Sequence, residues 1–381
     1  MRVLLCNKLH YPAGDAGSIR QYKLARMLRE LGHDAYVVGL GPASGFMEQS
    51  YKEIPYVSLR HGNTRFIDKV LSHLMYWPRL RKVLRKWQPD VLIMDDMGCV
   101  TTVQVKCFCK KRRIQMIHDS VEWYSPEQFQ HRKLAVGYIK KDILNRYLID
   151  CSCKVIAISS YLEKHFATKG IKTVRIPIVI TEDDLSHEKR LNPEKTVFTY
   201  AGQPGKKDFL PIMLEAFALL EEEEREKVIF HIVGCNREQM IASGIQEDLI
   251  NKLSDHLVIH GRVDHTSVLE LLKETDFTVL VRDPEQRYAK AGFPSKVVES
   301  LANATPVLCN YSSDLLLYLK DGENAIIAHN PSAESVVIAM RKALALTMDE
   351  RKNMCDIALK TAREEFDMCL FFDIMSKILE Q

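Results

Sequence analysis

The sequence predicts an α/β fold made of two doubly wound domains that face each other across a cleft. Short β-branched runs alternate with stretches at helical spacing along both halves of the chain, and no long antiparallel pattern interrupts them. A polar segment at 181–194, without periodic apolar residues, separates the halves. We therefore expect an N-terminal domain at 1–185, a C-terminal domain at 186–365 and a final helix at 366–381.

Composition supports this reading. The 381 residues suffice for two ordinary domains, and 46% hydrophobic with 27% charged residues exclude a disordered or fibrous chain. A formal net charge of +3 is too small to indicate a nucleic-acid partner, and we expect none. The ten cysteines lack the spacing of a zinc site, and several stand in apolar runs. This favours reduced thiols in a cytoplasmic protein.

The N-terminal half opens with a predicted βαβ unit, a strand at 2–7, a helix at 18–31 and a strand at 35–40. The intervening loop carries Gly14 and Gly17 and leads into a helix N-terminus, but it lacks the Gly-x-Gly-x-x-Gly spacing. A plain βα turn is the alternative to a ligand-binding loop. We expect no leader segment, and no apolar run approaches the roughly 18 residues that cross a bilayer.

The stretch at 60–86 is basic and amphipathic. It carries eight Lys and Arg residues against one acid, Asp68, interleaved with aliphatic and aromatic residues. This pattern is typical of a helix on an anionic membrane surface, although a solvated helical hairpin broken at Pro78 is the alternative. A second basic run at 106–113 favours the membrane. We therefore expect a cytoplasmic protein that is peripheral at the inner face of the membrane.

Two buried strands follow, at 91–94 and 114–117, and the second ends in His118 and Asp119. Chemistry in α/β sheets lies at the carboxyl ends of the strands, so His118 is a candidate acid/base group, with a turn-capping role as the alternative. A strand at 154–158, a helix at 161–167 and a short strand at 173–177 complete this half.

The second half again begins with a strand, a glycine loop and a helix, at 197–201, 202–208 and 209–220. Gly205, Lys206 and Lys207 stand at the mouth of the helix. Lysines there favour a phosphate, while solvated charge is the alternative. Further strands are expected at 228–234, 257–263, 277–282, 306–309 and 325–327, and helices at 268–273, 314–320, 332–346, 349–366 and 369–380.

The loop between the strands at 277–282 and 306–309 contains Gly292 and Pro294 and leads into an apolar helix. Ser295 is placed to cap this helix, whose N-terminus suits a phosphate. Glu299 lies one turn inside and would repel a phosphate, so its expected partner is a hydroxyl pair such as a nucleotide ribose. A capping loop with a solvated glutamate is the alternative.

Gly292-Phe293-Pro294, Glu299 and the run at 304–307 resemble the signature of the retaining glycosyltransferases of family 4, whose fold is GT-B with two Rossmann-like domains. That signature is Glu-x7-Glu. The second Glu, which binds the nucleotide ribose in the family, matches Glu299. The first, which touches the donor sugar, is replaced by Ala291.

The resemblance also implies roles for other residues. Lys207 matches a lysine that holds the diphosphate, but Gln203 replaces an arginine of the family, so Arg282 and Lys296 become the candidates for a second cation. The resemblance places Gly17 and Arg20 opposite the donor phosphates and His118 beside the reacting sugar. The expected catalytic residues are His118, Lys207 and Arg282, and the expected donor-binding residues are Gly17, Arg20, Gly205, Lys206, Lys207, Gly292, Phe293, Pro294, Ser295, Lys296 and Glu299.

The implied activity moves a sugar, with retention, from a nucleotide-diphosphate sugar to a hydroxyl of a glycan or lipid-linked acceptor, in cell-surface polysaccharide or glycolipid synthesis. No cofactor and no metal are expected, since cations and helix dipoles take the metal's place and no Asp-x-Asp is present. In the family the last helix crosses back to the N-terminal domain. The alternatives are a nucleotide-sugar epimerase or phosphorylase, or a catalytically silent nucleotide-sugar binding partner.

Overall fold

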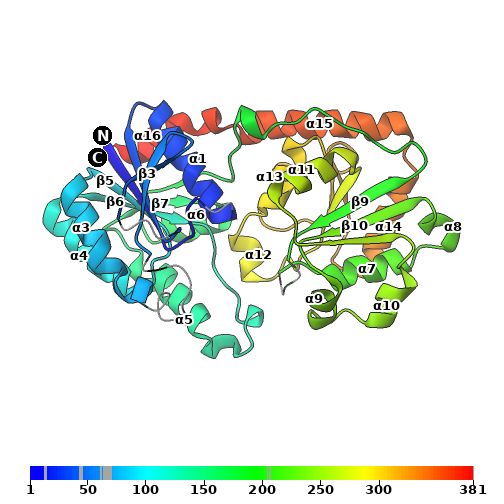
Figure 1. Cartoon of the computed structure of the whole chain (residues 1–381), viewed down its shortest axis with the longest axis horizontal. Helices are drawn as coiled ribbons and strands as arrows, with labels where there is room; N and C mark the ends of the chain where they lie inside the picture. Colours follow the sequence, from blue (N-terminus) through cyan, green and yellow to red (C-terminus); the bar gives the residue numbers. More distant parts are fainter. Residues whose placement is uncertain are drawn as a thin grey trace. The chain divides into compact units, whose positions relative to one another are not determined.

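The structure is a computed structural model that describes residues 1–12, 15–42, 46–60, 62, 71–203, 205 and 207–380 (Figure 1). The chain forms two compact units. Unit 1 contains Met1–Val179 and Met368–Gln381, and unit 2 contains Ile180–Asp367. The chain thus leaves unit 1 just before the polar segment and returns just before the last helix, whereas the sequence placed these limits at 185 and 365.

Unit 1 is built on a sheet of short, mostly buried strands: β1 (Arg2–Cys6), β2 (Asp34–Gly39), β3 (Gln49–Tyr51), β4 (Ile54–Ser58), β5 (Val91–Met94), β6 (Gln115–Ser120), β7 (Lys154–Ala157) and β8 (Thr173–Arg175). Their order is β3-β4-β2-β1-β5-β6-β7-β8, and only β3 and β4 pair antiparallel. The hairpin of β3 and β4 was not predicted from the sequence, because β3 is polar and mostly exposed and β4 contains Pro55.

Helices α1 (Ala16–Glu30), α3 (Tyr76–Trp87), α4 (Cys99–Arg112), α5 (Val136–Ile143) and α6 (Ser160–Ala167) connect these strands, and α16 (Phe372–Leu379) follows at the C-terminal end of the described chain (Figure 1). Asp15 caps α1 by accepting a hydrogen bond from the Ser18 amide at 2.7 Å. Apolar residues of α1 and α16, such as Leu28 and Met375, share one core with Leu5 and Val37 of the sheet. The helix at the end of the sequence therefore belongs to the first unit.

Unit 2 contains a second sheet, whose strands all pair in parallel: β9 (Thr196–Ala201), β10 (Val228–Val233), β11 (Leu257–Gly261), β12 (Phe277–Leu280), β13 (Val307–Cys309) and β14 (Ala325–Ile327). Their order is β11-β10-β9-β12-β13-β14. The helices are α7 (Leu210–Ala218), α8 (Glu222–Arg225), α9 (Arg237–Ala242), α10 (Glu247–Lys252), α11 (His265–Glu274), α12 (Arg287–Ala291), α13 (Ser295–Ala302), α14 (Ala333–Leu344) and α15 (Met348–Phe366). This is the doubly wound arrangement that the sequence predicted.

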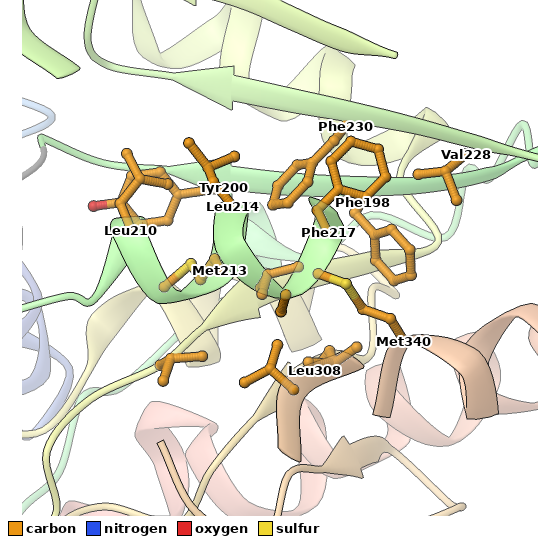
Figure 2. Packing of buried hydrophobic residues seen from close by; sticks show 14 of the residues in the cluster. Phe198, Tyr200, Leu210, Met213, Leu214, Phe217, Val228, Phe230, Leu308 and Met340 are labelled. Atoms are coloured by element: carbon orange, nitrogen blue, oxygen red, sulfur yellow. The ribbon is translucent and has the colours of Figure 1, made fainter. Parts of the chain in front are cut away.

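The core of unit 2 lies on the face of the sheet that α7 and α14 cover. Figure 2 shows Phe198, Phe217 and Phe230 packed together beside Met340 of α14. The rings of Phe217 and Phe230 meet edge to face with centroids 5.5 Å apart, a favourable aromatic geometry. Because alternate residues of β9 and β10 fill this core, the carboxyl ends of these strands are held in fixed positions.

Several elements differ from the sequence-based expectation. Pro78 does not break a hairpin but lies in the first turn of α3, where its missing N–H costs nothing. Residues 61 and 63–70 of the basic stretch lie outside the described residues. The helix expected at 314–320 is only a 3-10 turn, Leu315–Leu317, and a 3-10 turn at Met368–Phe371 precedes α16.

All ten cysteines are free thiols. Burial raises the pKa of Cys109 and Cys309 to about 12, so these two behave as small apolar residues rather than nucleophiles. Within the described part of the chain, no helix combines the length and the apolarity needed to span a bilayer.

A buried ion pair ties α1 to the sheet of unit 1. The Arg20 guanidinium donates to Asp119 of β6 through Nε and Nη2, at 2.9 and 2.8 Å, and both side chains are at most 6% exposed. Arg20 also donates to the carbonyl oxygens of Ile176 and Pro177. Protein acceptors therefore engage four of the five N–H groups of the guanidinium, which indicates a structural role for this expected donor-binding residue.

We expect Arg20→Ala to destabilise the protein by about 3–5 kcal/mol, because Asp119 would remain buried and charged without its partner. Urea denaturation measures this. The matched control is Arg26→Ala on the same helix, where Arg26 pairs with Glu30 and both side chains are at least 31% exposed; its cost should stay within about 1 kcal/mol. Equal costs for the two variants would contradict a structural role for the buried pair.

Candidate functional site

In unit 2, β9 and β12 are neighbours in the sheet, and the strand order reverses between them. After β9 the sheet continues on one side with β10 and β11, and after β12 it continues on the other side with β13 and β14. Doubly wound α/β sheets bind ligands at such a reversal, beyond the carboxyl ends of the strands. Here the segment after β9 meets the segment after β12, since the Phe209 amide donates to the Val281 carbonyl at 2.8 Å. Most of the residues predicted to bind the donor lie around this point.

Asp208, at the end of the loop after β9, holds two cations. It accepts a hydrogen bond from Arg282 Nε at 2.7 Å and from Lys296 Nζ at 2.5 Å, and Tyr200 Oη donates to it at 3.2 Å. Burial would raise the pKa of Asp208, but Arg282 and Lys296 outweigh it and lower the pKa to about 2. Asp208 is therefore ionised at any physiological pH.

Lys207 is the third cation of this group. Burial first, and then the charges of Arg282 and Lys296, lower its pKa from 10.5 to about 8. Its carbonyl oxygen accepts a hydrogen bond from Tyr288 Oη at 3.0 Å, which anchors the loop to α12. Counting Lys207, Arg282 and Lys296 against Asp208, the group carries three positive charges and one negative, a net charge of +2.

The positions of these cations are fixed by their neighbours. Asn310 holds the backbone of Arg282 on both sides, accepting from its amide at 2.9 Å and donating to its carbonyl at 2.8 Å. A Cβ at position 202 would lie 2.0 Å from Lys296 Nζ, so Gly202 leaves the space that the ammonium occupies. Gly205 is described and has open space around it, whereas Lys206 lies outside the described residues.

The loop and helix predicted to bind the nucleotide lie beside this group. Gly292 ends α12, and Phe293 packs against the rings of Tyr318 and Phe366, so its side chain anchors the loop. Pro294, not Ser295, occupies the N-cap position of α13, and no side chain caps this helix. The prediction that Ser295 caps the helix was wrong, because the helical turn begins one residue earlier than the hydroxyl would need.

Lys296 and Glu299, one turn apart on α13, line the same pocket together with apolar residues of α11, β12 and β13. Glu299 Oε1 lies 2.7 Å from Nε2 of His265, the first residue of α11. The hydrogen bond with Glu299 raises the pKa of His265. His265, Gly202 and Asp208 were not predicted as site residues. Gly202 and Asp208 belong to the predicted glycine loop at 202–208, whereas no motif in the sequence around His265 indicates a role for it.

In unit 1, His118 lies inside β6 and pairs with Met94 and Val155 rather than standing in a loop after the strand. It is 1% exposed, and neither ring nitrogen has a hydrogen-bond partner among the described residues. Burial, and then the charge of Lys141, lower the pKa of His118 to about 3, against the opposing effect of Asp96. The imidazole is therefore neutral.

His118 lies on β6, which is next to β5, and the strand order of unit 1 reverses between β1 and β5. Lys141 and Asp96 are the charged groups that act on His118. Lys141 Nζ lies 3.5 Å from Asp96 Oδ2, and burial raises the pKa of Asp95 to about 6. Gly17, by contrast, serves the packing of α1, since a Cβ there would lie 2.4 Å from Leu9 Cδ1. Among the described residues, no three His, Cys, Asp or Glu side chains form a group that could hold a metal ion.

Two family models match the chain in succession. The model described as Glycosyltransferase Family 4 matches residues 19–180, and the model described as Glycosyl transferases group 1 matches residues 181–361. No curated protein sequence matches the chain significantly.

Solved structures match nearly the whole chain at low identity. Sucrose-phosphate synthase from Thermosynechococcus elongatus has a TM-score of 0.79 at 13% identity, over 99% of this chain and 98% of that one. HepE from Anabaena, in complex with UDP and glucose, has a TM-score of 0.69 at 14% identity, over 100% and 99%. A glycosyltransferase from Rickettsia africae gives 0.69 at 13% identity, over 100% and 99%. With these matches and its two parallel-sheet units, the chain belongs to the group 1 and family 4-like glycosyltransferases and has the GT-B fold.

Proposed function

We propose that the protein is a retaining hexosyltransferase that takes its sugar from a nucleoside-diphosphate sugar and passes it to a hydroxyl acceptor. The observation that carries this proposal is the net charge of +2 on Lys207, Arg282, Lys296 and Asp208 at the strand-order reversal of unit 2. A diphosphate carries the complementary charge, and the N-terminus of α13 adds its dipole. The bound UDP of the Anabaena neighbour supports this ligand class.

The same cations serve the chemistry. When the bond between the sugar and the diphosphate breaks, negative charge grows on the leaving phosphate, and fixed positive groups there lower the barrier. Lys207 and Arg282 are the proposed catalytic cations, and they supply the charge that a metal ion would otherwise bring. Retention follows if the acceptor hydroxyl attacks the face from which the diphosphate departs.

The nucleotide and the sugar are assigned to different residues. Glu299 is the proposed acceptor for the ribose hydroxyls, and Gly205, Gly292 and Ser295 are proposed to offer backbone N–H groups to the phosphates. The donor-binding roles predicted for Lys206 and Pro294 stay predictions, because Lys206 lies outside the described residues and Pro294 has no N–H. His118, which is neutral and has unpartnered nitrogens among the described residues, is the proposed contact to the reacting sugar. Arg20 and Gly17 are left out of this assignment because contacts inside unit 1 already explain them.

A catalytically silent nucleotide-sugar binding protein is the second candidate, and Ala291 favours it. This residue is completely buried, and it replaces the glutamate that the family signature has at its first position. An enzyme and a binding protein share the same fold and the same nucleotide contacts, so only turnover separates them.

The decisive experiment is a panel of nucleotide sugars. Thermal shift should identify one nucleotide that stabilises the protein, by about 2.7 kcal/mol at a hundred times its dissociation constant. Mass spectrometry should then detect slow hydrolysis of the matching sugar donor, or transfer to a hydroxyl acceptor. Binding without any turnover would select the silent binding protein, and no stabilisation by any nucleotide would refute the proposal.

Two substitutions test the division of roles. Lys207→Ala should lower kcat about 10²–10³-fold, the usual effect of losing one group that stabilises the transition state, and should weaken nucleotide affinity as well. His118→Ala should lower kcat and leave nucleotide affinity nearly unchanged.

Because Lys207 loses its proton above about pH 8 in the free enzyme, kcat/KM should fall as the pH rises above that value. Lys207→Arg should move this fall to higher pH, and an unchanged pH profile would contradict the role.

We also propose that the enzyme works at an anionic membrane surface, with a lipid-linked acceptor in polysaccharide or glycolipid synthesis. Two neighbouring helices of unit 1, α3 and α4, contain no acidic residue. Trp77 packs on Phe108 and Trp87 on Tyr36, so both tryptophan rings are half-buried against protein neighbours. The expected attraction is therefore electrostatic, and the exposed cations that supply it are Arg81, Lys82, Arg85, Lys86, Lys110, Lys111, Arg112 and Arg113.

Replacing Arg81, Lys82, Arg85 and Lys86 by Gln should reduce sedimentation with anionic vesicles by more than about tenfold, since each cation contributes about 1 kcal/mol near such a surface. The matched control replaces four exposed lysines of unit 2 by Gln: Lys320, Lys342, Lys352 and Lys360. Neutral vesicles should bind neither protein, and salt should weaken the binding. An equal loss in both variants would show a general charge effect instead of a docking face.

A further inference from the structure

The contact between His265 and Glu299 lies at the nucleotide site but has no place in the transfer reaction described above. Nε2 of His265 is 2.7 Å from Oε1 of Glu299, a distance typical of a charge-assisted hydrogen bond. Both side chains are reached by solvent, with 57% and 36% of their surfaces exposed. An exposed pair of this kind contributes little to folding stability. Its position beside the candidate nucleotide site favours a role in ligand binding.

Both partners are held by their helices. His265 is the first residue of α11, and Asp264 caps that helix by accepting from the Ser267 amide at 2.9 Å. Glu299 is followed on α13 by Ser300, which is hydrogen-bonded to Thr278 of β12 at 2.6 Å. Within the described residues, no hydrogen bond engages Oε2 of Glu299, so one carboxylate oxygen is fixed and the other is open.

We propose that His265 is a positioning residue that orients Glu299 for the ribose and, by neutralising its charge, links nucleotide binding to the uptake of a proton. This inference rests on the proposed assignment of Glu299 to the ribose. His265 lies outside the proposed phosphate contacts and would make nucleotide binding dependent on pH.

The charges around the pair give the direction of the effect. His265 faces Glu299 on α13, Asp184 of the 3-10 turn Glu182–Asp184, and its own neighbour Asp264, all of them acids. Glu299 faces His265 and Lys296. A lone carboxylate beside a diphosphate repels it, whereas a carboxylate paired with an imidazolium does not. Nucleotide affinity should therefore be higher while His265 is protonated.

The contacts of His265 determine how nucleotide affinity changes with pH. The hydrogen bond with Glu299 raises the pKa of His265, so the imidazolium persists above the usual range and is lost as the pH rises. Coupling between two sites is reciprocal, so a bound nucleoside diphosphate should in turn hold the proton on His265. Lys207 and the nucleotide also titrate in this range, which makes a comparison between variants necessary.

The test is calorimetry with UDP, or with whichever of UDP, GDP and ADP binds in the panel, from pH 6 to 8.5. His265→Gln should bind about fivefold more weakly than the unmodified protein at pH 6, the lower end for coupled sites, and equally well at pH 8.5. Both proteins share the titration of the nucleotide and of Lys207, so these contributions cancel in the ratio of the two affinities at each pH. The control is His329→Gln, an exposed histidine of unit 2, whose ratio should stay near one.

A second measurement does not depend on binding. The NMR titration of the His265 imidazole should show a lower pKa in Glu299→Gln than in the unmodified protein, because the carboxylate has gone. A constant affinity ratio at all pH values, or tighter binding by His265→Gln, would overturn the inference. If Glu299→Ala weakens UDP binding in that case, the ribose assignment survives. If Glu299→Ala binds UDP unchanged, the assignment itself fails.

Discussion

Asp208 places one negative charge among three cations, and the candidate site depends on it. Arg282 comes from the end of β12, Lys296 from α13 and Lys207 from the loop after β9, so without the carboxylate three like charges would meet at one end of the sheet. Asp208 is 5% exposed, and in this environment its two ion pairs are little screened by water. Arg282 and Lys296 are therefore held in place without a ligand, as the proposed stabilisation of a leaving phosphate requires.

The polar group of unit 1 has a different electrostatic character. Three lysines, Lys8, Lys140 and Lys141, lie near Asp95 and Asp96, and the buried His118 is neutral, so the formal net charge of this group is +1, half that of the group in unit 2. What it offers is hydrogen-bonding capacity, since both nitrogens of His118 lack a partner among the described residues. The proposed assignment of the diphosphate to unit 2, and of the sugar hydroxyl groups to His118, rests on this difference.

Patterns within one element could be predicted from the sequence, and contacts between elements could not. The alternation of strands and helices predicted the two doubly wound sheets. The glycine loop and the helix that became α13 indicated Lys207, Lys296 and Glu299 as candidate site residues. No role was predicted for Asp208 or His265, because the partner of Asp208, Arg282, is 74 residues away and His265 is 34 residues from Glu299. The strand at His118 extends to Ser120 because β7 pairs with it up to that residue, which no local pattern records.

Ala291 stands where the family signature has its first glutamate. It is the last residue of α12 and is completely inaccessible, and the next residues lead into α13, which carries Lys296. A carboxylate in that position would lose its hydration at a cost of several kcal/mol unless a cation or several donors met it. Arg282 and Lys296 already serve Asp208. Position 291 of this chain therefore carries a small buried side chain without charge, and the carboxylate that contacts the cations is that of Asp208.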